Sequence, residues 1–381
     1  MSKTSNIKRV LKAILMISIC LGIGFLIGYV FGKIFGGGPA EQAQAAEGVA
    51  KKDIALIIIS SLLGIFGGTF LQLIIHEAGH LVCGLMSNYK FVSFRIFNFT
   101  LLKEDNQFKV KKFSVSGTAG QCLLSPPDKP TEKVPIFLYQ IGGVLFNLFL
   151  SAALMALAVW VADNTHIRMA LIITTCMGVL LVLANGIPMI VEGFPNDGYN
   201  VLHLNRDLKA KSALLNLLRA NALVQSGTRP KDLPNESFAK INDLDLTNCL
   251  EANLAVMYLS VLVQKGQISE AENLSRRIID ESKIGVIQLE AKLELACMLF
   301  NQGKSDEALA LFDKNELKMI DASAKTQSSK QRFLFMRALK AENDRQKAIA
   351  IFEHVQSAKD KYLMKGEVAM DLELMWNALK D

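Results

Sequence analysis

The sequence predicts an α-helical integral membrane protein with a small membrane-associated β-hairpin and a C-terminal soluble α-helical repeat domain. Three observations lead to this fold class. Four runs without a charged residue are long enough to cross a bilayer, and hydrophobic residues make up 51% of the 381-residue chain. From about residue 225 the composition becomes that of a soluble protein, with helical patterns only. The mean hydropathy of +0.28 fits a membrane half joined to a soluble half.

The four apolar runs define the membrane half. They extend from Ala13 to Phe31, from Ile54 to Ile75, from Val134 to Val161 and from Met169 to Val191. A membrane-spanning helix needs about 20 apolar residues, so each run has a suitable length. We expect three parts in the chain: an N-terminal membrane helix and linker (1–53), a membrane core (54–224) and a cytosolic helical-repeat domain (225–381).

The first run follows four basic residues, so it is either an uncleaved helix or a cleaved signal peptide. Its length and its distance from the alanine-rich stretch that follows favour an uncleaved helix. Gly24, Gly28 and Gly32 form a smooth face for close helix contact. Gly64 and Gly68 in the second run could supply the partner face, and a homodimer contact explains the glycines equally well.

Basic residues between the runs predict the orientation. Four precede the first run, seven lie between Met86 and Glu132, and the loop from Ala162 to Ile167 holds none. Because Lys and Arg are enriched in cytosolic loops, both termini are expected in the cytosol, with the chain in the cytoplasmic membrane of a bacterium. The net charge of +6 fits this orientation signal, so no nucleic-acid partner is expected.

Residues 89–116 are not helical in pattern. Aromatic and apolar residues from Tyr89 to Leu101 fall on one parity of an extended strand. A polar turn from Lys103 to Gln107 precedes a second alternating stretch, from Phe108 to Val115. We expect one β-hairpin here, whose aromatic residues suit a membrane interface and which ends before the prolines of the segment from Ser125 to Pro130.

Three segments of the soluble half repeat one theme, a turn residue followed five positions later by an alanine. The pairs are Gly266 and Ala271, Gly303 and Ala308, and Asn343 and Ala348. The alanines are 37 and 40 residues apart, so the array resembles tetratricopeptide repeats, whose period is about 34 residues, but irregularly. Such an array leaves a surface free for a cytosolic protein partner.

The pentapeptide His76-Glu77-Ala78-Gly79-His80 directly follows the second run. Two histidines four residues apart on a helix lie about 40° apart in projection, so both imidazoles can reach one metal ion. Glu77 lies roughly 100° from His76, on the flank where a base would meet water at that metal. This is the His-Glu-x-x-His zinc protease pattern, at a depth where each ionisable group costs roughly 2.5–3.5 kcal/mol.

A catalytic zinc ion takes three protein ligands, so a third is required. The best candidate is Asp197, just past the fourth run. Runs two and four cross in the same direction, which places His76 and Asp197 at one face of the membrane. Glu192 is the fallback ligand, and an Asx turn that caps a helix is the alternative role for Asp197. The remaining histidines, expected away from the metal, are His166, His203 and His354.

At these residues the chain resembles the site-2 protease family of intramembrane zinc metalloproteases. The pentapeptide is similar to that family's His-Glu-x-x-His helix, and Asn196-Asp197-Gly198 to its Asp-Gly motif, which carries the third zinc ligand. The segment from Gly143 to Asn147 lacks the proline of the family's Gly-Pro-x-x-Asn. Asn185-Gly186-Ile187-Pro188 resembles its Asn-x-x-Pro, with extra residues before Asp197. The resemblance covers about Ile54 to Leu223.

The resemblance implies Zn²⁺ bound by His76, His80 and Asp197. It implies Glu77 as the catalytic base, which takes a proton from water and returns it to the leaving amine. The substrate would be a membrane-spanning or membrane-associated peptide or protein, cut in or next to a transmembrane segment. The setting would be regulated intramembrane proteolysis, or the processing of a signal or pheromone peptide.

The hairpin is similar to a β element of this family that has been thought to help hold an extended substrate. Asn147 and Asn185 are expected to compete for backbone hydrogen bonds of that substrate. Interhelical packing through polar side chains explains these two asparagines equally well. The alternative function is a catalytically inactive membrane adaptor that recruits a partner through the repeat tail. A third is a metal-dependent hydrolase of a non-peptide substrate.

Overall fold

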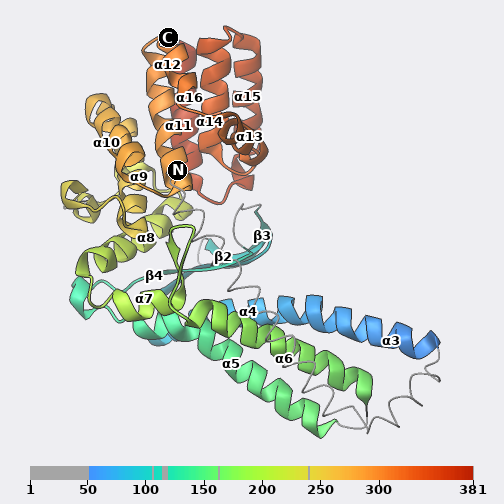
Figure 1. Cartoon of the computed structure of the whole chain (residues 1–381). Helices are drawn as coiled ribbons and strands as arrows, with labels where there is room; N and C mark the ends of the chain where they lie inside the picture. Colours follow the sequence, from blue (N-terminus) through green and yellow to red (C-terminus); the bar gives the residue numbers. More distant parts are fainter. Residues whose placement is uncertain (1–50, 105–106, 114–118, 162–163, 239–240, 381) are drawn as a thin grey trace, which may run out of the picture. The chain divides into compact units, whose positions relative to one another are not determined.

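Figure 1 shows the computed structural model of the chain, which describes residues 51–104, 107–113, 119–161, 164–238 and 241–380. The chain is mostly helical and divides into two compact units, Met1–Leu62 and Leu63–Asp381. The described residues of the first unit form helix α3 (Lys51–Leu62). The predicted span from Ala13 to Phe31, with its glycine face, lies outside the described residues.

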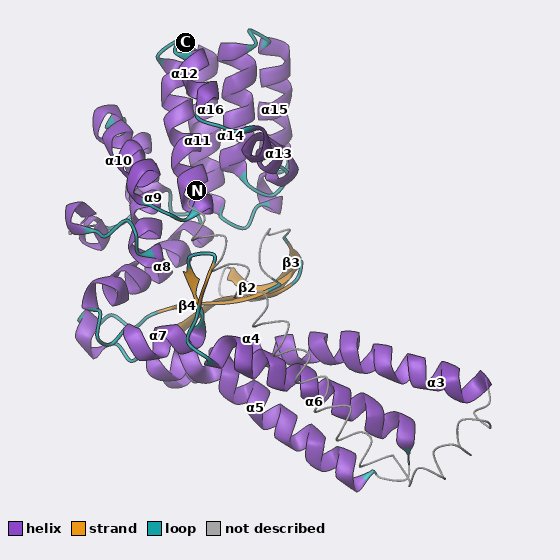
Figure 2. Ribbon diagram, viewed as in Figure 1, coloured by secondary structure: helices purple, strands orange, loops and turns teal. Residues whose placement is uncertain are grey.

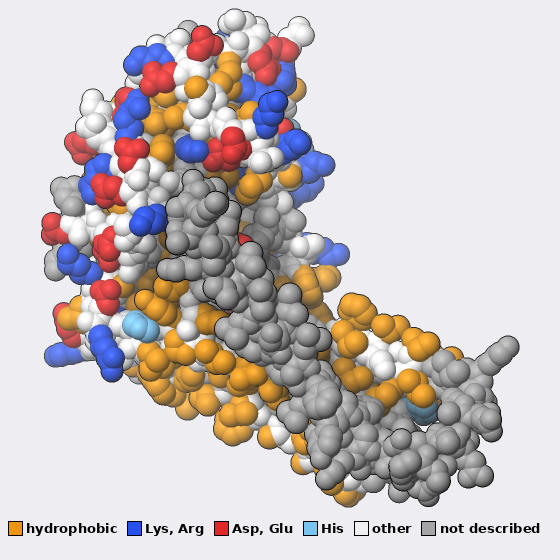
Figure 3. All heavy atoms as spheres, viewed as in Figure 1, with side chains coloured by type: hydrophobic (Ala, Val, Ile, Leu, Met, Phe, Trp, Pro, Cys, Tyr) orange, Lys and Arg blue, Asp and Glu red, His pale blue; other side chains and the backbone are white. Residues whose placement is uncertain are grey.

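Three helices of the described chain are long and apolar enough to cross a membrane: Ala55–Met86, Thr131–Trp160 and Thr165–Gly186. They include the π-helical turn η1 (Leu63–Gly67) and the helices α4 (Gly68–Met86), α5 (Phe137–Trp160) and α6 (Thr165–Gly186). Hydrophobic side chains gather over these helices, whereas charged side chains gather over the helical tail (Figure 3). The last three predicted runs are thus helices of membrane-spanning length, and their insertion into a bilayer stays a prediction.

Two of these helices differ in extent from the predicted runs. Helix α4 continues past Ile75 to Met86, so the pentapeptide lies within the helix. Helix α6 ends at Gly186 instead of continuing to Val191. The reason is Ile187, which has the extended conformation (φ −75°, ψ 122°) that a residue before proline prefers. The last residues of the predicted run form a short strand instead.

Glycines allow α4 to lie in close contact with its neighbours. A Cβ atom on Gly79 would lie 2.2 Å from the carbonyl oxygen of Gly142 in α5, and one on Gly142 would lie 2.4 Å from that of Gly79. Gly64 and Gly68 approach α6 in the same way, since a Cβ atom on either would lie within 2.7 Å of an α6 side-chain atom. The prediction that Gly64 and Gly68 form the partner face for an N-terminal helix is therefore wrong, because α6 occupies that face.

A four-stranded antiparallel sheet follows α4 (Figure 2). Its strands are β1 (Lys90–Ile96), β2 (Phe99–Glu104), β3 (Gln107–Lys112) and β4 (Gly120–Ser125). Their spatial order is β3-β2-β1-β4, so β3 and β4 are the two edge strands. Of these, β4 contacts both α4 and the later helix α8 (Leu208–Ser226), which places this edge next to the pentapeptide helix.

The prediction of a single hairpin over 89–116 is wrong in its number of strands and right in the position of its polar turn. The chain reverses at Phe97 and Asn98, where Phe97 has a positive φ of 49°. No glycine marks this turn, so the alternating pattern alone predicts one long strand. The predicted polar turn is confirmed, because Glu104 pairs with Gln107 across it. The sheet also gains β4, beyond the predicted end of the hairpin.

A short hairpin connects α6 to the segment that holds the third ligand candidate. It consists of β5 (Ile190–Val191) and β6 (Phe194–Pro195). Its two turn residues, Glu192 and Gly193, both have positive φ, 52° and 94°. Helix α7 (Asp197–His203) begins directly after this hairpin.

The rest of the chain is helical. After α8 its α-helices are α9 (Cys249–Gln264), α10 (Ile268–Glu281), α11 (Gly285–Asn301), α12 (Ser305–Ala310), α13 (Lys314–Ser323), α14 (Ser328–Met336), α15 (Arg345–Ser357) and α16 (Lys365–Lys380). The 3₁₀ segments are η2 (Thr131–Lys133), η3 (Pro230–Asp232), η4 (Asn235–Phe238), η5 (Ile241–Asp243) and η7 (Lys359–Lys361), and η6 (Arg337–Ala341) is π-helical. One hydrophobic core extends from α9 to α16 and holds these tail helices together.

The predicted turn-and-alanine theme corresponds to three turns between helices of the tail. Each turn residue has a positive φ, and each alanine is 0% exposed. The turn residues are Gly266, Gly303 and Asn343, and the alanines are Ala271, Ala308 and Ala348. A side chain this small lets the second helix of each pair pack closely on its neighbours. The assignment to a tetratricopeptide-like repeat stays a prediction.

The Gly142→Ala variant tests the close approach of α4 and α5. The added methyl group has no space beside Gly79, so we expect a loss of about 1–3 kcal/mol in unfolding free energy, as for other overpacked cores. Thermal unfolding of the purified chain in detergent measures it. The control is Gly285→Ala in α11, where a Cβ atom would meet nothing within 4 Å and alanine favours the helix. Equal melting temperatures for the two variants would contradict the close contact.

Candidate metal centre

The three predicted metal ligands come together from two distant parts of the chain. Helix α4 presents His76 and His80 one turn apart, and Asp197 is the first residue of α7. The two Nε2 atoms lie 3.2 Å apart, and Asp197 Oδ2 lies 3.2 Å from one and 3.3 Å from the other. Within the described residues, this is the group of His, Cys, Asp and Glu side chains whose ligand atoms converge closely enough for one ion.

Hydrogen bonds determine which nitrogen of each imidazole faces the third ligand. His76 Nδ1 donates to the side-chain oxygen of Asn147, and His80 Nδ1 donates to the backbone oxygen of Tyr139, both at 2.7 Å. Both partners are carbonyl oxygens, so each Nδ1 carries the hydrogen and each Nε2 keeps a lone pair. Two nitrogen lone pairs and one carboxylate oxygen therefore converge.

This arrangement fits a zinc ion. Ligand atoms at 2.0–2.1 Å from a tetrahedral zinc ion are about 3.3 Å from one another. The three separations found here, 3.2, 3.2 and 3.3 Å, agree with that geometry. Two imidazoles and one carboxylate are a ligand set typical of catalytic zinc, which keeps a fourth position open for water or substrate.

The position of Asp197 is fixed by its neighbour Asn196. The Asn196 side-chain oxygen accepts hydrogen bonds from the backbone N–H groups of Met189 and Tyr199, and its amide donates to two carbonyl oxygens at the end of α6. Asn196 is thus the N-cap of α7, the role considered as the alternative for Asp197. Burial raises the pKa of Asp197, but hydrogen bonds and positive charge from the two histidines, when these are protonated, outweigh burial and lower the pKa to about 2. The carboxylate is therefore ionised at neutral pH.

Asn147 lies behind His76, in a network of buried polar groups. Its amide donates to the backbone oxygen and to the side-chain oxygen of Gln72, both at 2.7 Å. Gln72 in turn donates to Ser151 at 3.3 Å. Asn147 is 0% exposed, so it orients a metal ligand from α5 and packs between helices, with no open face toward a substrate. The predicted substrate contact of Asn147 is therefore at odds with its burial.

The other predicted residues lie outside this network. Asn185 is half-buried, and its amide donates to the backbone of its own helix, at Leu181. The fallback ligand Glu192 is exposed in the turn of the β5–β6 hairpin. His166 lies in α6, where a loop was expected, and His354 is exposed on α15.

Glu77 lies next to His76 on α4, half-buried under strand β4. A Cβ atom on Gly120 would lie 2.7 Å from Glu77 Oε1, so the bare backbone of β4 covers the carboxylate. Sequence reasoning missed both Gly120 and Gln72. Gln72 had a signal, since it is polar, lies in an uncharged run and precedes His76 by one helical turn. Gly120 had none, because only the sheet brings it to Glu77.

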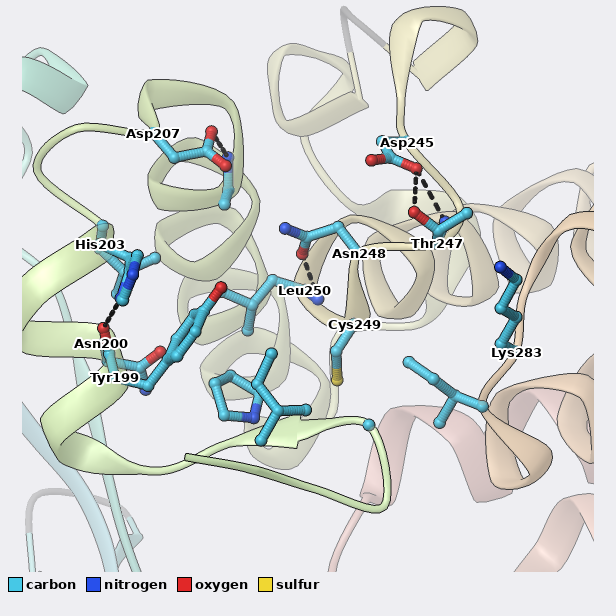
Figure 4. A pocket seen from close by; sticks show the side chains of 16 residues that line it. Tyr199, Asn200, His203, Asp207, Asp245, Thr247, Asn248, Cys249, Leu250 and Lys283 are labelled. Atoms are coloured by element: carbon cyan, nitrogen blue, oxygen red, sulfur yellow. Dashed lines mark hydrogen bonds between the residues drawn. The ribbon is translucent and has the colours of Figure 1, made fainter. Parts of the chain in front are cut away.

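A cavity of about 340 Å³ lies on the other side of α7. Figure 4 shows the residues that line it, among them Tyr199, Asn200 and His203 of α7, and Asn248 at the start of α9. The His203 ring stacks on Tyr199, with centroids 3.9 Å apart, and its Nδ1 lies 2.9 Å from the Tyr199 backbone oxygen. His203 therefore contacts its own helix, and in the described part of the chain it is not one of the three side chains whose ligand atoms converge.

No protein-family model, curated protein or solved structure matches the chain. The resemblance to site-2 proteases therefore depends on the two motifs and on the geometry of their side chains. That geometry can be tested without knowledge of the substrate.

The Asn147→Ala variant tests the orientation of His76. Loss of the acceptor frees the imidazole to rotate or change tautomer, and loss of such a partner typically weakens metal binding about 10–100-fold. Competition with a chelator of known affinity measures the zinc affinity of the purified chain. Asn185→Ala is the matched control, since in the described chain that amide donates to Leu181 of its own helix, and the zinc affinity of this variant should equal that of the unaltered chain. Equal affinities for both variants would show that Asn147 does not orient His76.

Proposed function

We propose that the protein is an intramembrane zinc endopeptidase of the site-2 protease type. Its substrate would be a membrane-spanning or membrane-associated protein, cut in or next to a transmembrane segment. The observation that supports this most strongly is the convergence of His76, His80 and Asp197 at 3.2–3.3 Å beside Glu77, with the two histidines and Glu77 in a helix of membrane-spanning length. A structural metal site would need neither the adjacent carboxylate nor the open fourth position.

Each residue has a role in peptide-bond hydrolysis. A zinc ion bound by the three ligands would supply Lewis acidity toward water and the scissile carbonyl group. Glu77 takes a proton from the attacking water at its carboxylate and delivers it to the amide nitrogen as the C–N bond breaks. Asn147 and the Tyr139 carbonyl keep the imidazole lone pairs directed at the site.

The sheet suggests how a transmembrane substrate is presented. A membrane helix shields its carbonyl groups with its own hydrogen bonds, so it must unwind before it can be cut. An unwound segment can pair with a sheet edge, which satisfies its backbone and fixes its register. Strand β4 is the edge strand that covers Glu77, so we assign presentation of the substrate to this side of the sheet.

We place the chain in the cytoplasmic membrane of a bacterium, with both termini, the sheet and the helical tail in the cytosol. The sheet contacts the tail, since Glu104 of β2 binds Lys365 of α16 as well as Lys111 of β3, and these two lysines lower the pKa of Glu104 to about 2. Sheet and tail thus lie on one side. The C-terminal end of α5 and the N-terminal end of α6 lie at the other ends of the long helices, away from the sheet (Figure 1).

Cysteine labelling of intact cells tests this topology. A membrane-impermeant maleimide should label single cysteines placed at Gln44 or Asn164, which are expected outside. Cysteines at Asn106 or Thr228 should react only after permeabilisation. The unaltered chain gives the background from its six native cysteines. Labelling of a cysteine at Asn106 in intact cells would show that the chain has the opposite orientation in the membrane.

The division between metal ligand and base is tested with three variants. Glu77→Gln should abolish cleavage and keep zinc bound, because the carboxylate is a base and not a ligand. His80→Ala and Asp197→Ala should lose both bound zinc and cleavage, because each removes a metal ligand. Metal analysis together with cleavage of a transmembrane reporter decides the matter. Full zinc occupancy in Asp197→Ala would remove that residue from the ligand set, and undiminished cleavage by Glu77→Gln would exclude the proposed mechanism.

A further inference from the structure

The helical tail contains a largely buried group of charged side chains with more acids than bases. It joins two residues each from α11, α14 and α16: Glu290, Glu294, Lys330, Arg332, Glu367 and Asp371. Arg332 pairs with Asp371 at 2.7 Å and also contacts Glu294, and Lys330 lies 3.7 Å from Glu290. Four carboxylates therefore share two cations, and we refer to these six residues as the acidic cluster.

Two oxygens of this cluster are buried without a hydrogen-bond partner in the described part of the chain. They are Glu294 Oε2 and Asp371 Oδ2, on side chains that are 7% and 0% exposed. Burial of such an atom without a partner is costly, and the cost is greater for a charged group. The cluster thus lacks positive charge and hydrogen-bond donors, and an additional cation would supply both.

Glu367 connects the cluster to a cavity. The cavity has a volume of about 240 Å³, and among the residues that line it Glu367 is the charged one. Burial and the nearby carboxylates of Asp371, Glu290 and Glu294 raise the pKa of Glu367. Lys365, two residues before it, pairs with Glu104 and does not line the cavity. The cavity therefore ends at a carboxyl group that has no basic residue beside it in the cavity lining.

The opposite wall of this cavity belongs to the sheet that covers the candidate metal centre. Gln121 and Leu123 of β4 line it, together with Asn221 and Gln225 of α8. Gln121 directly follows Gly120, whose backbone lies on Glu77. An extended chain advances about 3.3 Å per residue, so a peptide beside β4 would reach the cavity within about five residues of the bond at Glu77.

We propose that the acidic cluster is a subsite for a lysine or arginine that flanks the transmembrane segment of the substrate on its cytosolic side. This inference rests on the proposed peptidase function. Membrane proteins carry an excess of Lys and Arg in their cytosolic flanks, and the tail is placed in the cytosol. A cation entering past Glu367 relieves the excess negative charge and donates hydrogen bonds to the carboxylates. Residues at the flank, rather than at the cleaved bond, then determine which segments are held long enough to be cut.

Reporter substrates that differ only in the cytosolic flank test this subsite. One carries Lys-Lys, a second Ser-Ser and a third Glu-Glu, and all are cut by the unaltered full-length chain in proteoliposomes. A charge-assisted contact should make kcat/KM for the Lys-Lys reporter about tenfold higher than for Ser-Ser, through KM, with Glu-Glu the poorest. Equal kcat/KM values for all three reporters would overturn the inference. This comparison uses only the unaltered chain, so it does not depend on the folding of a variant.

Substitutions then locate the effect. In the Glu290→Gln/Glu367→Gln variant, we expect the ratio of kcat/KM for the Lys-Lys reporter to kcat/KM for the Ser-Ser reporter to fall to about twofold or less. The matched control is Glu353→Gln, on an exposed position of α15, which should keep the full preference. An equal loss in the control would mean that general surface charge, and not the subsite, attracts the flank.

Direct binding separates this inference from the proposed function. A fluorescent peptide with the Lys-Lys flank should bind the full-length Glu77→Gln chain more tightly than its Ser-Ser counterpart, and Glu290→Gln/Glu367→Gln should remove the difference. Binding without cleavage of any reporter by the unaltered chain would sustain the subsite and refute the peptidase. Cleavage without any effect of the flank would sustain the peptidase and refute the subsite.

Discussion

The structure is organised around the convergence of three electron-rich atoms in a largely apolar surrounding. The Nε2 atoms of His76 and His80 and the Oδ2 atom of Asp197 would repel one another if nothing positive lay between them. Helix packing and the cap of α7 hold the three atoms in place against this repulsion. The free energy of metal binding would then stabilise the fold as well, because the same contacts join α4 to α7.

Small residues on two helices make this convergence possible. Gly79, inside the pentapeptide, lets α5 approach so closely that Asn147 and the Tyr139 carbonyl reach the two imidazoles. A Cβ atom on Gly143 would lie within 2.7 Å of His76 ring atoms, so this position too must be bare. The part of the sequence that matches the family pattern incompletely, Gly143 to Asn147, thus provides space and orientation for a ligand, for which the missing proline is not required.

Features that depend on local sequence were predictable, and those that depend on the approach of distant segments were not. Charge-free runs predicted the long helices, and the four-residue spacing placed His76 and His80 on one face. Even the meeting with Asp197 followed from counting helix directions. The sequence did not predict the turn at Phe97, because the turn contains no glycine. It did not predict the role of Gly120 either, because that role arises only when β4 packs on Glu77. No single-residue property carries that information.

The bare strand above Glu77 has a consequence for selectivity. Where β4 passes the carboxylate, Gly120 contributes only main-chain atoms, and these are the same in every polypeptide. Under the proposed function, a catalytic site beside this strand would distinguish extended from helical segments, but it would discriminate little among the amino acids on either side of the cleaved bond. Such an enzyme would tolerate sequence drift at its cleavage sites. Its choice among membrane proteins would depend on how readily a segment unwinds and on features farther along the chain.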